Sequence, residues 1–249
     1  MIQIVKDSDT SPLFFLQTAH TTYGMRVMET GHLEHLYYGE RITVDSQDPS
    51  SCTPLVIQRA FAPGNTCTYD REHPQISMED VCLEVGTLGK GDIREPFLEV
   101  RFNDGSVTSD FTFDSYEVIT LKEREQCLQD SGLPHSYSEA ETDSAECLQI
   151  ILQDVTNHLE LQLFYTVFEE CDVITRSARL INHSDASVTL NRCLTVRSDR
   201  GLFCDHSFQR CLGTRNAQRT DFLTFRQIYK CVLYGNLFEP LESFYDPGT

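Results

Sequence analysis

The chain carries little positive charge and no long hydrophobic run. It has 20 Lys and Arg against 38 Asp and Glu in 249 residues, which gives a formal net charge of −18. Proteins bind nucleic acid by neutralising phosphates with Lys and Arg, so this balance argues against a nucleic-acid partner. No stretch approaches the about 20 apolar residues that a membrane-spanning helix needs. The sequence therefore predicts a protein that binds neither nucleic acid nor membranes.

Several motifs of common enzyme classes are also missing. The ten cysteines include no Cys-x-x-Cys pair, so the spacing gives no zinc ribbon or redox motif. The chain has no Gly-x-Ser-x-Gly elbow, no Gly-x-Gly-x-x-Gly after a strand and no phosphate loop, which leaves serine hydrolase, dinucleotide and NTPase functions without support. No cofactor is expected. Residues 1–16 contain Lys6, Asp7 and Asp9 and lack a signal-peptide core, so we expect a cytoplasmic protein with reduced, structural cysteines.

The hydrophobic pattern is that of β-strands. Residues 13–44 predict a three-strand meander, and 148–194 predict further strands, including a long hairpin in which apolar residues alternate from Leu159 to Val167 and again from Ile174 to Leu180. Residues 45–96 predict a long irregular loop, and 123–143 a polar surface excursion. The Asn103-Asp104-Gly105-Ser106 turn predicts a hairpin between flanking strands. The expected fold is all-β, a large antiparallel β-sandwich with long loops and a poorly specified C-terminal tail.

The tail differs from the rest of the chain. Residues 197–249 hold seven basic and six acidic residues, a net charge of +1, which leaves −19 for residues 1–196. The β-alternation also weakens at this point. We therefore expect a sandwich domain over 1–196 and a divergent or truncated segment of the same domain over 197–249.

Few residues stand out as ligands or catalysts. His32 and His35 are too few for a zinc site, and their spacing on a strand directs them to opposite faces, so structural hydrogen bonds are the better interpretation. The loop from Gly86 to Pro96 is a stronger candidate for contacts with sugar hydroxyls or another chain, because it combines glycines with charged side chains. On sequence alone, an Arg94 ion pair that only ties the loop down is slightly favoured over such contacts.

Three segments carry a family resemblance. They are Leu163 to Ser184, Gly31 to Gly39 (Gly-His-Leu-Glu-His-Leu-Tyr-Tyr-Gly) and Gly89 to Pro96 (Gly-Lys-Gly-Asp-Ile-Arg-Glu-Pro). Together they closely resemble the N-terminal β-sandwich domain of glycoside hydrolase family 36 α-galactosidases. The resemblance covers about residues 12–196. The family usually continues into a Gly-Ala-Trp-Ala-Arg-Glu-Arg segment, whereas this chain has no Trp.

The resemblance implies a function without catalysis. In this family a (β/α)8 barrel hydrolyses terminal α-galactosides with retention, using a Lys-x-Asp-x-Asn-Arg motif that the chain lacks, so we expect no hydrolysis by the chain alone. In the family, long loops of the N-terminal sandwich help form the substrate entrance and the oligomer interface. By this likeness, substrate or interface contacts fall to Asp70, Asp80, Glu84, Asp92 and Arg94, and the implied partners are α-galactosides and further copies of the chain. The alternatives are a carbohydrate-binding module with weak galactoside affinity, or a structural fragment without activity.

Overall fold

The computed structural model describes residues 1–6, 11–45, 52, 55, 67–127, 145–169, 172–193, 215–217 and 222–230. Strands dominate this part of the chain, with one short helix. In chain order the elements are β1 (Ile2–Val5), β2 (Leu13–Gln17), β3 (Thr21–Val27), β4 (Leu33–Glu40), β5 (Leu98–Arg101), β6 (Thr112–Thr120), α1 (Leu121–Cys127), β7 (Glu146–Asp154), β8 (Leu159–Phe168), β9 (Val173–Asn182), β10 (Val188–Cys193), β11 (Arg215–Ala217) and β12 (Phe222–Lys230).

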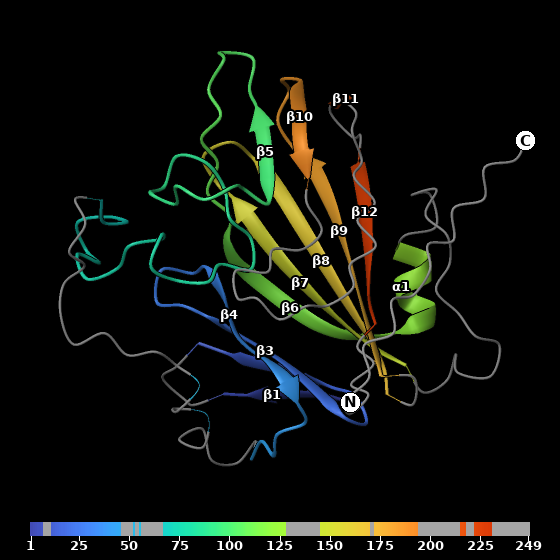
Figure 1. Cartoon of the computed structure of the whole chain (residues 1–249). Coiled ribbons are helices and arrows are strands. Elements are labelled where there is room, and N and C mark those ends of the chain that lie inside the picture. Colours follow the sequence, from blue (N-terminus) through green and yellow to red (C-terminus); the bar gives the residue numbers. More distant parts are fainter. Residues whose placement is uncertain are drawn as a thin grey trace, which may run out of the picture.

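The strands form three antiparallel sheets. Their orders are β1-β2-β3-β4, β11-β10-β5 and β12-β9-β8-β7-β6. Figure 1 shows the four-stranded sheet packed beside the five-stranded sheet, with β5 and β10 at the upper end of the larger layer. The all-β, antiparallel sandwich expected from the sequence is confirmed.

The main core lies between the layers. Alternate residues of β8 point inward from Leu159 to Val167, because successive side chains of a strand face opposite sides of the sheet. Phe14 and Met25 of the four-stranded sheet meet them, and both are fully buried. The alternation that predicted the β8–β9 hairpin is therefore the alternation between core and outer face, and β8 and β9 pair from Leu159 opposite Asn182 to Phe168 opposite Val173.

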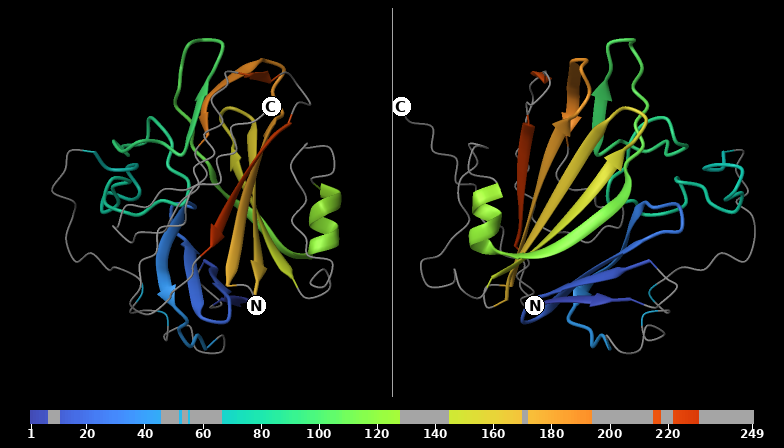
Figure 2. Two further views of the ribbon diagram at one scale, coloured as in Figure 1. Left: turned by 45° about the vertical axis from the view of Figure 1, so that its right-hand side comes forward. Right: turned by 180° about the vertical axis from the view of Figure 1, so that it is seen from behind.

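Helix α1 covers the outer face of the five-stranded sheet, on the side away from the four-stranded sheet (Figure 2). Arg124 of the helix donates from Nη2 to Ser177 Oγ of β9 at 3.3 Å. Thr120 and Glu123 form a reciprocal cap: Glu123 N donates to Thr120 Oγ1, and Thr120 N donates to Glu123 Oε2. The helix overlaps the start of the polar excursion that the sequence predicted over 123–143, and the rest of that excursion, 128–143, lies outside the described residues.

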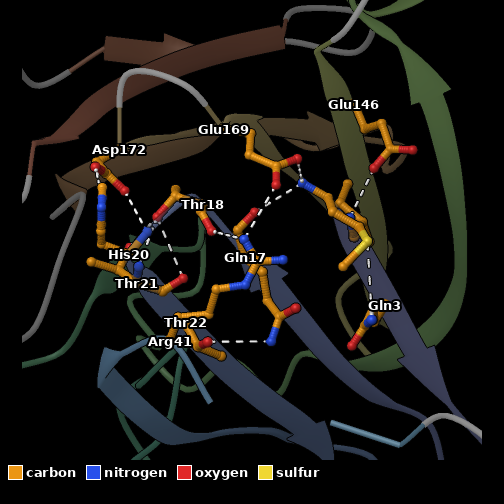
Figure 3. Close-up of polar contacts among 12 residues, drawn as sticks. Gln3, Gln17, Thr18, His20, Thr21, Thr22, Arg41, Glu146, Glu169 and Asp172 are labelled. Atoms are coloured by element: carbon orange, nitrogen blue, oxygen red, sulfur yellow. Dashed lines mark hydrogen bonds and ion pairs between the residues drawn. The ribbon is translucent and has the colours of Figure 1, made fainter. Parts of the chain in front are cut away.

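Contacts between the β2–β3 turn and the β8–β9 turn join the two layers at one end (Figure 3). Asp172, in the β8–β9 turn, accepts hydrogen bonds from His20 N at 2.8 Å and pairs with His20 Nδ1 at 2.6 Å. Arg41, just after β4, donates to Thr18 O at 2.6 Å and to Glu169 Oε1 at 3.2 Å. The β2–β3 turn is thereby bound to the tip of the β8–β9 hairpin, which fixes the two sheets relative to each other.

The structure confirms one strand prediction and corrects another. The 13–44 meander is confirmed as β2, β3 and β4. The hairpin predicted around residues 103–106 is wrong as a strand pair: the turn is present, with Phe102 N bonded to Ser106 O, but β5 pairs with β10 and β6 pairs with β7. The turn signal is local, whereas the choice of strand partner depends on contacts between segments far apart in the chain.

Candidate functional site

The residues picked out by the sequence gather in the connection between β4 and β5. We call its described part, residues 67–97, the long loop; it lies against β4 and runs up to β5 (Figure 1). Glu84 N donates to Leu33 O at 2.9 Å and His35 N donates to Cys82 O at 2.7 Å, so the loop adds a short bridge to the edge of β4. Phe97 N donates to Gly86 O at 2.8 Å and closes the loop's far end. The predicted irregular loop is confirmed over these residues.

Arg94 ties the second limb of the loop, residues 86–97, to its first limb, residues 67–81. Its Nε donates to Asp92 Oδ1 at 2.8 Å, and its Nη2 donates to Met78 O at 2.9 Å and to Val81 O. The Asp92 side chain is only 2% exposed, while that of Arg94 is 25% exposed. One guanidinium thus satisfies several acceptors in the fork geometry that suits arginine. The ion pair that ties the loop down, one of the two interpretations of Arg94, is present.

Glu84 lies inside the sandwich. Its carboxylate accepts hydrogen bonds from Tyr23 Oη at 2.7 Å and Tyr165 Oη at 2.6 Å, one from each layer, and pairs with Arg176 Nη1 at 3.2 Å. Arg176 also donates to Glu84 O at 3.2 Å and stacks over the Phe97 ring at 4.6 Å. Both charged side chains are 3% exposed. A carboxylate this deep is tolerated when it is paired and hydrogen-bonded, as that of Glu84 is.

The charges around Glu84 decide its ionisation. Burial by itself raises the pKa of a carboxyl group, but Arg176 and His35 lower the pKa of Glu84 below its ordinary value. His35 Nδ1 lies 4.0 Å from Glu84 Oε2 and its ring packs on Tyr23 at 4.7 Å. Glu84 is therefore ionised. Through it, the loop supplies the negative member of an ion pair in the core.

A second carboxylate, Asp110, ties both limbs of the loop to the main body. Asp110 accepts from His32 Nε2 at 2.9 Å, from Tyr69 Oη at 3.0 Å and from Lys90 Nζ at 2.8 Å. Burial opposes its ionisation, yet the bonds from His32 and Lys90 lower the pKa of Asp110 to about 2. Burial and the Asp110 charge together raise the pKa of Tyr69. Tyr69 and Lys90 come from the two limbs, so one carboxylate holds the loop at two points.

Asp70 and Asp80 lie nearer the surface. Asp70 Oδ1 accepts from Glu72 N at 2.9 Å and His73 N at 2.7 Å, and so caps its own turn. Asp80 is partly exposed at a turn closed by its N–H donating to Ser77 O at 3.1 Å. The five predicted residues thus separate into two groups: Glu84 and Asp92 support the loop from inside, whereas Asp70, Asp80 and Arg94 keep part of their surface in solvent. A ligand contact by Glu84 or Asp92 stays a prediction that their burial does not favour.

Sequence reasoning missed Asp110 and its ring of donors. Only His32 was singled out, and its structural hydrogen-bonding role is confirmed. In the described ranges, no group of three or more His, Cys, Asp or Glu residues could hold a metal ion. Within the same ranges no helix is long and apolar enough to cross a membrane. Cys204, Asp205 and His206 are consecutive in the sequence but are too weak a pattern to predict a site, and they lie outside the described residues.

Comparisons with known proteins agree on one family. The glycosyl hydrolase family 36 N-terminal domain matches residues 31–199. The bifunctional alpha-galactosidase/sucrose kinase AgaSK of Mediterraneibacter gnavus is 37% identical over 75% of this chain and 19% of its own length. Alpha-galactosidase AgaA of Geobacillus stearothermophilus is 32% identical over 75% of this chain and 24% of its own.

Solved structures give the same answer. The alpha-galactosidase of Lactobacillus brevis superposes with a TM-score of 0.63 at 30% identity, over 77% of this chain and 24% of that one. The galactosidase domain of AgaSK gives a TM-score of 0.62 over 78% of this chain and 25% of that one. The chain thus spans about a fifth to a quarter of the length of the relatives it matches. By sequence and by fold, it belongs to the glycosyl hydrolase family 36 N-terminal domain family.

Proposed function

We propose that this chain serves as the non-catalytic N-terminal domain of an α-galactosidase-type protein, in which the long loop shapes a substrate entrance and an oligomer contact. The matched relatives are named alpha-galactosidases, and the chain corresponds only to their N-terminal part. The two closely spaced carboxylates that retaining hydrolysis requires are assigned in this proposal to the part of such proteins beyond this domain.

The observation that carries the proposal is the rigid support of the long loop. Glu84 anchors it in the core, Asp110 holds both of its limbs, and Arg94 joins the two limbs to each other. Binding costs less when a loop is already held in one conformation, because little conformational entropy remains to be lost. A loop held at three points, with charged side chains at its surface, suits the recognition of polyols better than a loop that only connects two strands.

In this proposal the surface-facing residues contact the ligand or the neighbouring subunit. Asp70, Asp80 and Arg94 take that role, and Glu84 and Asp92 fix the backbone that presents them. Carboxylates and a guanidinium are suitable acceptors and donors for sugar hydroxyls. The proposed partners are α-galactosides, bound weakly by the isolated domain, and further copies of the chain.

Two further parts of the proposal concern nucleic acid and the cellular compartment. The net charge of −18 speaks against nucleic acid as a partner. The exposed Cys67 is free, as expected in a reducing compartment, and we therefore propose the cytoplasm.

The test of the entrance role is a titration of the 15N-labelled chain with melibiose, followed by amide chemical shifts. We expect small shifts confined to residues 69–95, with incomplete saturation at millimolar sugar, because the domain supplies only part of an entrance. Maltose, an α-glucoside, is the matched control and should shift these amides less. Saturation at low millimolar melibiose would instead establish a carbohydrate-binding module. The absence of any shift in the long loop would argue against the entrance role.

A further inference from the structure

The first limb of the long loop holds an imidazole that the family resemblance did not pick out. His73 Nδ1 lies 2.9 Å from Asp70 Oδ1 and 3.1 Å from Asp70 Oδ2, and His73 N donates to Asp70 Oδ1 at 2.7 Å. A pair of this kind, three residues apart at a turn, is by itself an ordinary cap. The other ring nitrogen, Nε2, distinguishes it, because no group among the described residues bonds to that atom.

The turn that carries His73 is fixed against the sheet. Tyr69 N donates to Ile76 O at 2.8 Å, and Ile76 N donates to His73 O at 3.0 Å. Ile76 belongs to the same buried cluster as Met28, the residue that follows β3. His73 also precedes Pro74, and a proline narrows the backbone conformations of the residue before it. The His73 side chain is therefore held in place, and it is 23% exposed.

The Asp70 carboxylate determines which ring nitrogen carries the proton. Burial opposes its ionisation, but the bonds from His73 and from Glu72 N lower the pKa of Asp70 below its ordinary value. An ionised carboxylate only accepts hydrogen bonds, so His73 Nδ1 carries the proton that lies between them. Nε2 of the neutral ring is then an acceptor with a free lone pair. A hydroxyl group, which can donate a hydrogen bond, is the chemical complement of this nitrogen.

A second histidine has the same pairing in a different setting. His20 Nδ1 lies 2.6 Å from Asp172 Oδ2, and again no described group bonds to Nε2. The His20 side chain, however, is 77% exposed and lies where the β2–β3 turn meets the β8–β9 turn. A side chain this exposed loses rotamer freedom when it binds a ligand, whereas that of His73 is already ordered. His20 is therefore a matched control for His73.

We propose that His73 Nε2 accepts a hydrogen bond from a hydroxyl group of a galactoside bound at the long loop, and that Asp70 orients the imidazole for this contact. The inference rests on the entrance role in the proposed function and assigns it a residue. Asp70 acts here as a positioning residue, through His73. The contact replaces a hydrogen bond between the sugar and water, so we expect it to change the affinity by only about two- to tenfold.

The full chain, labelled with 15N, tests the contact. Long-range 1H–15N spectra of the imidazoles report the tautomer and the shift of each ring nitrogen while melibiose is added. We expect His73 to be protonated at Nδ1 only, and its Nε2 shift to move with melibiose while that of His20 does not. A purely structural His73 would give no such movement.

Variants measure how much the contact contributes. His73→Phe should lower the initial slope of the loop amide shifts against melibiose concentration by about two- to tenfold. His73→Gln, whose amide oxygen can lie near the position of Nε2, should recover part of that slope. His20→Phe should leave it unchanged.

The outcomes separate this inference from the proposal beneath it. If the loop amides shift with melibiose but His73 Nε2 does not, the entrance role stands and the His73 contact is refuted. If neither shifts, the entrance role fails, and the His73 contact fails with it. A proton on Nε2 in the free chain would also overturn the inference, because that nitrogen could not then accept. The wild-type spectra alone decide these cases, whether or not a variant folds.

Discussion

Replacing Glu84 with alanine is expected to lower the free energy of unfolding by about 3–5 kcal/mol, the usual loss when one member of a buried ion pair is removed. The substitution leaves Arg176, whose side chain is 3% exposed, without its carboxylate. It also removes the acceptor for the hydroxyls of Tyr23 and Tyr165. Urea denaturation, followed by circular dichroism, measures the change.

A matched substitution shows what burial contributes to this effect. Glu95 pairs with Arg192 at 2.6 Å, but its side chain is 65% exposed. Glu95→Ala should change stability by less than about 1 kcal/mol, because solvent screens exposed pairs. Equal losses for Glu84→Ala and Glu95→Ala would show that the Glu84 carboxylate is not a buried charge and would contradict its placement in the core.

Replacing Asp110 with asparagine is expected to cost about 2 kcal/mol at neutral pH and less in acid. The pKa of Asp110 in the folded protein is about 2, below the ordinary value of 3.8. Because the folded-state pKa is the lower one, ionised Asp110 stabilises the fold above the unfolded-state value, and this contribution is lost as the pH falls toward about 2. A shift of this size corresponds to about 2 kcal/mol, and about half of it is lost by pH 3.

The measurement compares wild type and Asp110→Asn by urea denaturation at neutral pH and near pH 3. The difference in stability between the two proteins should narrow by about 1 kcal/mol in acid, since asparagine does not titrate. Hydrogen exchange should also show faster exchange around Tyr69 and Lys90 in the variant, because both limbs of the long loop lose a tie. A difference that is constant with pH would show that Asp110 does not stabilise the fold through its charge.

Local pattern was enough to predict strands β2 to β4 and β7 to β10, but not β1, β11 or β12. The alternation from Leu159 to Val167 and the polar break before Ile174 predicted the β8–β9 hairpin, because one face of each strand is buried along its length. The Thr120-x-x-Glu123 capping box is a local sequence signal for the start of helix α1. The hairpin expected at Asn103 to Ser106 failed because a turn motif does not determine which strands pair.

The supports of the long loop were beyond local pattern. Glu84 and Arg176 are 92 residues apart in the chain, and Asp110 is 78 residues from His32. No periodicity links such residues, so only the packed sheets bring them together. The family resemblance pointed to this loop as the contact site, which stays a prediction. It also grouped the buried Glu84 and Asp92 with the more exposed Asp70 and Asp80, because a sequence motif does not distinguish residues that hold a loop in place from residues at its surface.

The central claim is that this chain is a folded domain that does not itself hydrolyse galactosides. The most direct measurement is an aryl α-galactoside assay across the size-exclusion peak of the purified chain, with mass by light scattering and with the Geobacillus stearothermophilus AgaA as a positive control. We predict a folded, β-rich species without turnover above the buffer rate. Turnover that follows the protein peak would contradict the account, because it would place the chemistry within these 249 residues.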